Sequence, residues 1–257
     1  MRQSPTKSLV PYVTGGITPD WTDYLLAYQD AGAGAIEIGL PFSDPMVDGP
    51  TIQQAADRAL ARGVTVASIL GDVARVRDRM RVPLIAMTYA NLVFRRGAPE
   101  FCRQLAEAGI GGLIVPDLPV DEAAEVEAAA AEAGIDLILL VAPVTPEARL
   151  AEIVAHSRGS VYAVSVMGTT GERATFADST ARLAARIKAA TDLPVMIGFG
   201  VSTPEQAAAA GRAGDRVVVA SALMRRVLDG ATPDDLRHEV AALRAAVDLA
   251  DREAGPM

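Results

Sequence analysis

Three carboxylate side chains lie close together in the stretch IEIGLPFSDPMVDGPTIQ, residues 36–53. Glu37 is inside an apolar run typical of a buried strand, where a charged carboxylate is costly to keep without a partner. Asp44 and Asp48 follow on a segment rich in proline and glycine, which is typical of a loop. Burial raises the pKa of a carboxyl group toward neutrality, so acids beside a core are candidates for proton transfer.

The elements that position these acids recur regularly along the chain. Short, almost continuously apolar runs alternate with alanine-rich helical patterns, as expected of parallel strands covered on both faces. The eight runs begin at Leu9, Ala35, Pro83, Gly112, Asp136, Val161, Pro194 and Arg216. Eight alternations in 257 residues, without a linker or low-complexity break, predict an α/β fold with one (β/α)8 TIM barrel as a single domain over residues 1–257. An open doubly wound sheet is the alternative.

Two connections depart from the regular spacing. The gap between the second and third strands has room for an extra helix, Thr51 to Ala61, before the usual one, Val66 to Arg79. The link after the sixth strand, MGTTGERATFADS, is rich in glycine and threonine and predicts a mobile loop. Both connections follow the carboxyl ends of strands, which is the face where barrels build active sites.

Within such a barrel, the alternation of side chains separates Glu37 from its neighbours Ile36 and Ile38. We expect Glu37 at the mouth of the barrel interior, because a carboxylate facing packed helices would lack both water and a partner. The alternative is a structural glutamate held by an ion pair or by backbone hydrogen bonds. On composition alone, Asp48 is better explained as a helix or turn cap and Asp44 as a turn former.

A further acid and several glycines also follow strand ends. Asp117, in VPDLPVDE, is equally compatible with a site on the top face and with a cap for the following helix. GTTG (168–171), GFG (198–200) and the pair Ala220–Ser221 come after the sixth, seventh and eighth strands. Barrels often bind phosphate near the last strands through backbone N–H groups, so the combination predicts a phosphorylated ligand. The alternatives are ordinary glycine turns and an ordinary N-cap at Ser221.

Composition excludes several mechanisms. The net charge of −8 argues against general nucleic-acid binding. Neither histidine (His156, His238) follows a strand, and neither lysine (Lys7, Lys188) is on one, which disfavours His-rich metal sites and Schiff-base chemistry. The single cysteine, Cys102, is expected to be a buried apolar residue. With no disulfide, secretory signal or apolar run long enough to cross a membrane, the chain is expected in the cytoplasm.

These motifs together resemble the α subunit family of tryptophan synthase. The similarity is carried by EIGLPFSDPMVDGPTIQ, MTYANLVF, VPDLPVDE, GTTG, GFGVSTPEQ and Ala220–Ser221, and it runs from about Leu9 to about Leu228. The family is a (β/α)8 barrel that cleaves indole-3-glycerol phosphate to indole and D-glyceraldehyde 3-phosphate, a lyase reaction of tryptophan biosynthesis. No metal or cofactor is implied in this chain, and pyridoxal phosphate (PLP) is expected in a partner β subunit.

The resemblance assigns roles to individual residues. Glu37 matches the catalytic glutamate that protonates the indole ring, and Asp48 matches the aspartate that stabilises the indole N–H. Tyr162 matches a tyrosine that lies beside the glutamate. Thr170 matches a threonine that contacts the aspartate when the loop closes. The phosphate-binding positions correspond to Gly171, Gly200, Ala220 and Ser221. The positions that line the substrate pocket correspond to Tyr12, Ile52, Met87, Tyr89 and Phe199.

The partner expected from the resemblance is a PLP-dependent β subunit in an α2β2 complex, contacted by the loop that carries Asp44 and Pro45. Two features are expected to depart from the family pattern: the N-terminal helix that plugs the barrel is expected to be shortened or absent, and Ala220 stands where glycine is common. The alternatives are a stand-alone lyase that releases free indole, and a weakly active subunit that mainly activates its β partner. Another phosphate-binding barrel, such as an isomerase, is a further alternative.

Overall fold

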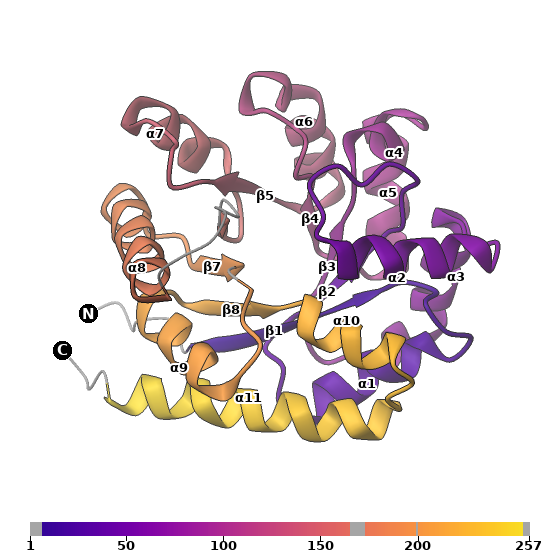
Figure 1. The fold of residues 1–257 in the computed structure, drawn as a ribbon. Coiled ribbons are helices and arrows are strands. Elements are labelled where there is room, and N and C mark those ends of the chain that lie inside the picture. The colour runs from indigo at the N-terminus through magenta and orange to yellow at the C-terminus, as the bar shows by residue number, and fades with distance from the viewer. Residues whose placement is uncertain (1–6, 165–172, 199, 254–257) are drawn as a thin grey trace.

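Eight parallel strands form a closed barrel in a computed structural model that describes residues 7–164, 173–198 and 200–253. Each strand pairs with the next in sequence, and β8 pairs with β1 to close the barrel (Figure 1). The strands are β1 (Ser8–Thr14), β2 (Ile36–Gly39), β3 (Leu84–Met87), β4 (Gly112–Ile114), β5 (Asp136–Val141), β6 (Val161–Val164), β7 (Val195–Gly198) and β8 (Arg216–Val219). The predicted TIM barrel and all eight predicted strands are confirmed.

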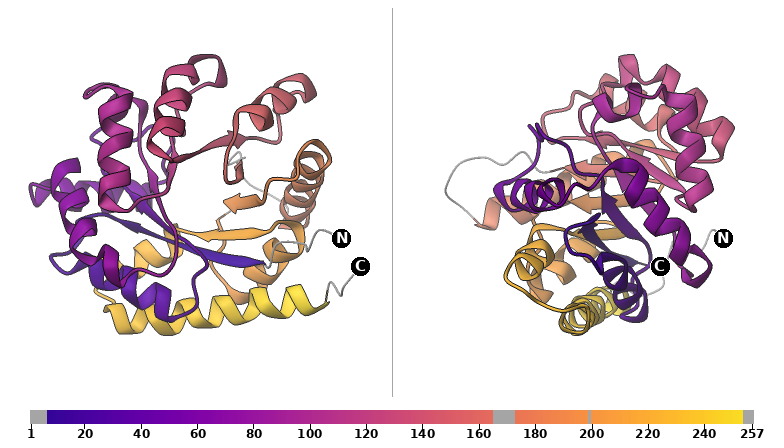
Figure 2. Two further views of the ribbon diagram at one scale, coloured as in Figure 1. Left: turned by 180° about the vertical axis from the view of Figure 1, so that it is seen from behind. Right: turned by 90° about the vertical axis from the view of Figure 1, so that its right-hand side faces the viewer.

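Helices surround the strands on the outside of the barrel, as the end-on view in Figure 2 shows. They are α1 (Trp21–Asp30), α2 (Pro50–Ala61), α3 (Val66–Val76), α4 (Ala90–Phe94), α5 (Ala98–Ala108), α6 (Ala124–Ala133), α7 (Glu147–His156), α8 (Arg173–Ala190), α9 (Pro204–Ala213), α10 (Ser221–Leu228) and α11 (Pro233–Glu253). Two 3-10 turns, Arg77–Arg79 and Val120–Glu122, complete the described elements. None of the described helices is long and apolar enough to cross a membrane.

Helix starts follow local capping chemistry. Thr65 and Ser68 form a reciprocal capping box at the start of α3, in which each side chain bonds the backbone N–H of the other. At α9 the Thr203 side chain accepts a hydrogen bond from the Gln206 N–H, and Pro204 occupies the first turn.

The hydrophobic core has two parts. A large cluster fills the layer between strands and helices and includes Ile36 and Ile38 of β2. A smaller cluster fills the barrel interior with one side chain from each strand, except that Ala35 immediately precedes β2: Val10, Ala35, Ile85, Ile114, Ile138, Tyr162, Met196 and Val218. Side chains nearer the carboxyl ends of the strands pack on this inner layer.

Some element boundaries differ from the sequence-based expectation. Two helices, α2 and α3, lie between β2 and β3, and the last residues expected in the second helix form the 3-10 turn Arg77–Arg79. Helix α8 begins at Arg173, so the second half of the predicted loop MGTTGERATFADS is helical. The short helix α4 and the long helix α11, which packs against α9 and α1, were not predicted. Residues 1–6, on which the expectation of a shortened or absent plug helix bears, lie outside the described residues.

Candidate active site

Glu37 lies inside the barrel near the carboxyl end of β2. Its register partners are Tyr12 on β1 and Ile85 on β3, and Ile85 belongs to the inner apolar cluster. The flanking Ile36 and Ile38 belong to the outer cluster, so alternation along the strand directs Glu37 inward. Only 1% of Glu37 is exposed, and its Oε2 atom has no hydrogen-bond partner among the described residues. This orphan oxygen is available to a ligand.

The electrostatic surroundings of Glu37 favour its protonated form. Burial raises the pKa of Glu37 from 4.5 to about 8, and the nearby negative charge of Asp48 acts in the same direction. Burial also raises the pKa of Tyr162 well above its usual value, with the charge of Glu37 as the next cause. At neutral pH the site therefore holds a carboxylic acid, which can donate a proton, beside a neutral phenol, which can donate a hydrogen bond.

Two strand glycines make room for the tyrosines around Glu37. A Cβ atom on Gly39 would lie 1.8 Å from the Tyr12 hydroxyl oxygen, and one on Gly198 would lie 2.3 Å from a ring carbon of Tyr162. The residues at both positions must therefore lack a side chain if the rings are to fit inside the barrel. The need for glycine at position 39 was not predicted from the sequence, although a glycine within a strand is a signal of close approach by another group.

Asp48 does not cap the helix that follows it. The N-cap of α2 is Gly49, and no side chain caps this helix. The Asp48 carboxylate instead accepts a hydrogen bond from the Tyr89 hydroxyl, with 2.9 Å between the oxygens Oη and Oδ2. Burial raises the pKa of Asp48, whereas the hydrogen bond from Tyr89 lowers it. The capping explanation for Asp48, which composition alone favoured, is wrong.

A small enclosed cavity lies beside Asp48 at the mouth of the barrel. It is lined by Asp48 and by four of the residues predicted for the substrate pocket, Tyr12, Ile52, Met87 and Tyr89, together with Gly39, Phe42 and Thr88. Its volume is about 20 Å³, room for one water molecule, so a bicyclic ring would require the lining side chains to move. The fifth predicted pocket residue, Phe199, lies outside the described residues.

The predicted phosphate positions lie after two neighbouring strands. Gly200 follows β7 in the left-handed conformation (φ +58°), and Ala220 and Ser221 follow β8. Ala220 is the N-cap of α10 and Ser221 is its first residue, so the alternative of Ser221 as an N-cap is wrong. A helix N-terminus presents free backbone N–H groups that attract an anion. Gly171 and the predicted loop-closing residue Thr170 lie outside the described residues.

The two remaining acids are on the surface. Asp44 is exposed and accepts a hydrogen bond from the Ser43 hydroxyl, and Pro45 is partly buried beside it. Asp117 accepts a hydrogen bond from the Ala90 backbone N–H, at 2.8 Å. It therefore caps α4, the helix after β3, and not the helix that follows it in sequence. No group of three metal-ligating side chains occurs among the described residues.

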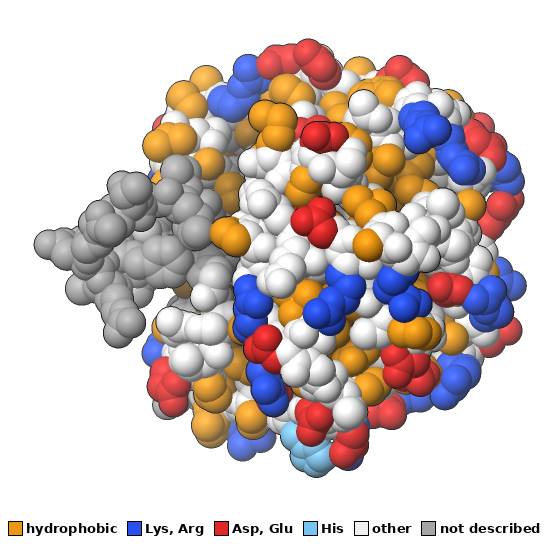
Figure 3. Space-filling view, turned by 45° about the vertical axis from the view of Figure 1, so that its right-hand side comes forward, with side chains coloured by type: hydrophobic (Ala, Val, Ile, Leu, Met, Phe, Trp, Pro, Cys, Tyr) orange, Lys and Arg blue, Asp and Glu red, His pale blue; other side chains and the backbone are white. Residues whose placement is uncertain are grey.

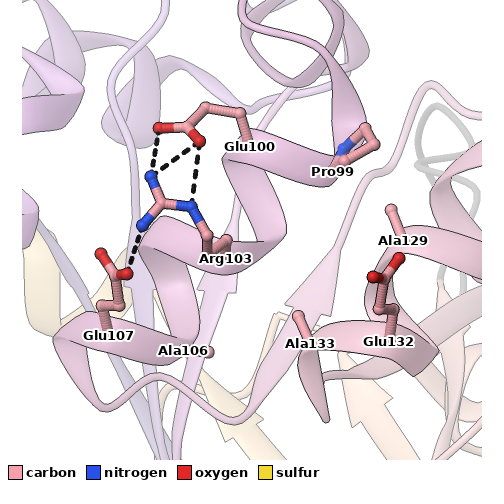
Figure 4. A pocket seen from close by; sticks show the side chains of 8 residues that line it. All are labelled: Pro99, Glu100, Arg103, Ala106, Glu107, Ala129, Glu132 and Ala133. Atoms are coloured by element: carbon pink, nitrogen blue, oxygen red, sulfur yellow. Dashed lines mark hydrogen bonds and ion pairs between the residues drawn. The ribbon is translucent and has the colours of Figure 1, made fainter.

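The outer surface differs from this site. Over the face in Figure 3, acidic side chains lie beside basic ones. A groove of about 510 Å³ lies between α5 and α6 (Figure 4), where Arg103 bonds both Glu100 and Glu107. These carboxylates are solvent-exposed and already paired, so the groove lacks the orphan buried acid that marks the barrel mouth.

Comparisons with known proteins agree with the geometry. The family model for the tryptophan synthase alpha chain matches residues 1–253. The chain belongs to the tryptophan synthase alpha chain family. The match continues past Leu228, where the similarity in the sequence analysis ended, and includes α11. Among relatives, the alpha chain of Gluconacetobacter diazotrophicus is 47% identical over 93% of this chain and 90% of its own length. That of Citrifermentans bemidjiense is 44% identical, over 88% and 85%.

Solved tryptophan synthase structures superpose closely on this barrel. The alpha subunit from Legionella pneumophila has a TM-score of 0.87 at 33% identity, covering 95% of this chain and 93% of its own. Mycobacterium tuberculosis tryptophan synthase gives 0.86 at 40% identity, with the same coverage. The tryptophan synthase complex from Pyrococcus furiosus gives 0.84 at 35% identity, covering 94% and 99%. Tryptophan synthase alpha chains are lyases of tryptophan biosynthesis without a cofactor of their own; the PLP belongs to the beta subunit.

Proposed function

We propose that this chain cleaves indole-3-glycerol phosphate to indole and D-glyceraldehyde 3-phosphate, with Glu37 and Asp48 as the catalytic acids. The observation that carries the proposal is the orphan Oε2 of Glu37, buried inside the barrel close to a second carboxyl group. A buried acid without a partner costs stability, and substrate binding is the simplest reason to retain it. The identity of the proposed reaction is inferred from membership of the alpha chain family.

Glu37 has the protonation state that the first step needs. As a neutral acid it gives its proton to C3 of the indole ring, and the ring becomes an electron sink. The glycerol hydroxyl on the adjacent carbon then returns a proton to the Glu37 carboxylate while the carbon–carbon bond breaks and its electron pair restores the aromatic ring. One proton leaves Glu37 and one comes back, so the acid is regenerated in each turnover.

Asp48 stabilises the ring while it carries positive charge. The hydrogen bond from the ring N–H to the carboxylate becomes stronger as positive charge develops on that nitrogen. Because the interaction is strongest in the transition state and the site has a low dielectric, it accelerates the reaction. Tyr162 is a neutral phenol beside Glu37 that can orient its carboxyl group. Tyr12, Ile52, Met87, Tyr89 and Phe199 form the proposed ring pocket.

The phosphate group is proposed to bind across the ends of β7 and β8. Backbone N–H groups of Gly200, Ala220 and Ser221 supply the donors. Gly171 and Thr170 lie outside the described residues, and their assignment to the phosphate site and to loop closure rests on the family resemblance alone. Ala220 keeps the N–H of the usual glycine, so its methyl group does not remove a donor. The N-terminal end of α10 adds the positive end of a helix dipole.

The partner is proposed to be a PLP-containing beta subunit in an α2β2 complex, docked over the carboxyl ends of the strands. Large apolar side chains are exposed there: Met46 (90%) and Val47 (58%) on the loop of Asp44 and Pro45, Phe94 on α4, and Val144 after β5. Exposed apolar groups gathered around a site are typical of protein contact surfaces. The proposed compartment is the cytoplasm, in keeping with the free, buried thiol of Cys102.

Indole release by the purified chain tests the proposal, with and without a tryptophan synthase beta subunit. We expect turnover in both conditions and a faster rate with the partner. Absence of turnover in both conditions would refute the lyase assignment. A fast rate that the partner leaves unchanged would instead favour the stand-alone lyase, which the same measurement distinguishes.

A further inference from the structure

Tyr89 joins Val47 and Asp48, two consecutive residues of the loop between β2 and α2, to the barrel through one hydroxyl group. Its oxygen donates to Asp48 Oδ2 at 2.9 Å and accepts from the Val47 backbone N–H at 3.2 Å. A phenol carries a single proton. Because the Val47 N–H can only donate, the phenol proton is directed to Asp48, and Asp48 must receive it as an acceptor.

The ring of Tyr89 provides a second contact to the same loop. It stacks on Phe42 with 5.2 Å between ring centroids and an interplanar angle of 30°. Phe42, Val47 and Asp48 all belong to the segment between β2 and α2. Tyr89 itself is buried (6% exposed), whereas its two hydrogen bonds to the loop are only partly buried.

Tyr89 itself is fixed to the barrel. It follows β3 closely and is the N-cap residue of α4. The preceding Thr88 N–H bonds the Ile114 carbonyl of β4, and the following Ala90 N–H bonds Asp117. These two backbone hydrogen bonds, one on each side of Tyr89, hold its main chain in place. Its side chain can therefore support the loop, which contains no strand or helix.

The main chain of Asp48 is held separately. Gln53 on α2 donates through Nε2 to the Asp48 carbonyl at 2.8 Å and to the Pro45 carbonyl at 3.4 Å. Gln53 therefore fixes the backbone, and Tyr89 fixes the carboxylate. Among the described residues, Asp48 Oδ1 has no hydrogen-bond partner, whereas Oδ2 is occupied by Tyr89.

We propose that Tyr89 is the positioning residue of Asp48: it holds Oδ2 and leaves Oδ1 directed to accept the N–H of the substrate ring. The inference rests on the proposed function for the identity of that ring, and it assigns Tyr89 a role beyond lining the pocket. The hydrogen bond also favours the ionised form of Asp48, because donation to a carboxylate lowers its pKa and opposes part of the larger effect of burial.

The test is the variant Tyr89→Phe, which keeps the ring and its stacking on Phe42 but removes the hydroxyl group. We expect kcat to fall about tenfold or more, the range for losing a hydrogen bond to a charged group, with a smaller change in KM. The acid limb of the pH–rate profile should move to higher pH because Asp48 loses the bond that lowers its pKa. The matched control is Tyr24→Phe, whose buried hydroxyl bonds the Ala231 carbonyl away from the site.

A double variant separates positioning of Asp48 from a general effect of the hydroxyl group. In an Asp48→Asn background, adding Tyr89→Phe should change kcat by less than about twofold, since the two changes remove one interaction. Full additivity of the two effects would overturn the inference. So would an unshifted acid limb in Tyr89→Phe.

A measurement that needs no turnover tests the inference apart from the proposed function. The Val47 amide should be protected from hydrogen exchange in the wild type and lose about tenfold or more of that protection in Tyr89→Phe. A Val47 amide in the wild-type protein that exchanges as fast as an open peptide would overturn the inference, even if the variant cannot be folded. If the wild type cleaves no substrate but Val47 behaves as expected, the proposed function fails while the contact between Tyr89 and the loop stands.

Discussion

Gly39 lies directly against the hydroxyl group of Tyr12. A carbon added at Gly39 would be 1.8 Å from the hydroxyl oxygen and 2.5 Å from the ring carbon that bears it. Both positions are on the inward face of their strands, and Tyr12 pairs in register with Glu37 on the neighbouring strand. The lack of a side chain at one position therefore determines where the ring beside the buried acid can lie.

Gly39→Ala should lower the free energy of unfolding by about 1–3 kcal/mol and reduce indole release, because the added methyl group displaces Tyr12 into the pocket. Chemical denaturation and turnover measure the two effects. Gly111→Ala is the control, since no atom lies within 4 Å of the place that its methyl group would occupy. Combining Gly39→Ala with Tyr12→Phe should recover part of the stability, because the nearest clashing atom is gone. Equal stability of Gly39→Ala and wild type would contradict this account.

Glu37→Gln should abolish turnover and make the protein less sensitive to alkaline pH. The pKa of Glu37 is about 8 in the folded chain and near 4.5 when exposed. Below pH 4.5 both states are protonated; between pH 4.5 and 8 the unfolded state releases its proton first, so the stability of the wild type falls as pH rises. Urea denaturation at about pH 5 and about pH 8 should show a larger loss for the wild type than for the variant. An identical loss in both proteins would show that Glu37 is not the buried neutral acid inferred here.

The pH–rate profile should fall on the alkaline side as Glu37 loses its proton. With a pKa of about 8, the acid is mostly protonated at pH 7 and mostly ionised above about pH 9. On the acid side, turnover should fall at a pH above the usual range of an aspartate, because burial raises the pKa of Asp48. Steady-state rates from about pH 5 to about pH 10 measure both limbs. A rate that stays constant across the alkaline half of that range would exclude Glu37 as the proton donor.

Met46→Asp should weaken binding of a beta subunit by about tenfold or more, since a charge would replace an exposed apolar side chain at the proposed contact. Titration calorimetry with the purified partner measures the dissociation constant. Leu249→Asp on α11 is the matched control: Leu249 is also exposed (59%) but lies on the long outer helix. If both variants bind equally well, the docking surface lies elsewhere.

The sequence predicted the barrel because the determining signals are local and repeated. Apolar runs bounded by glycine or proline recur along the chain, and each of the eight became a strand. The inward direction of Glu37 followed from the two-residue period of a strand together with the cost of burying a carboxylate among packed helices. The motif around Glu37 and Asp48 indicated the family, and the match to the family model shows that the chain belongs to it.

Contacts between residues far apart in the sequence could not be predicted from local sequence patterns. Asp48 precedes a helix, as a cap would, but its carboxylate is bound by Tyr89, 41 positions later. Asp117 caps a helix that precedes it in the chain, because the ends of β3 and β4 are neighbours in the barrel. Helix α4 is only five residues long, too short for its periodicity to distinguish it from a turn.

By itself, the sequence determined the class of fold, the strand that carries the buried acid and the family of the protein, because periodicity and contiguous motifs are properties of the chain. Only the tertiary structure decided which oxygen of Asp48 is held, which glycines make space for Tyr12 and Tyr162, and how far the pKa of Glu37 rises. These properties depend on barrel closure, which brings separate strands within hydrogen-bonding distance and excludes water from the space between them.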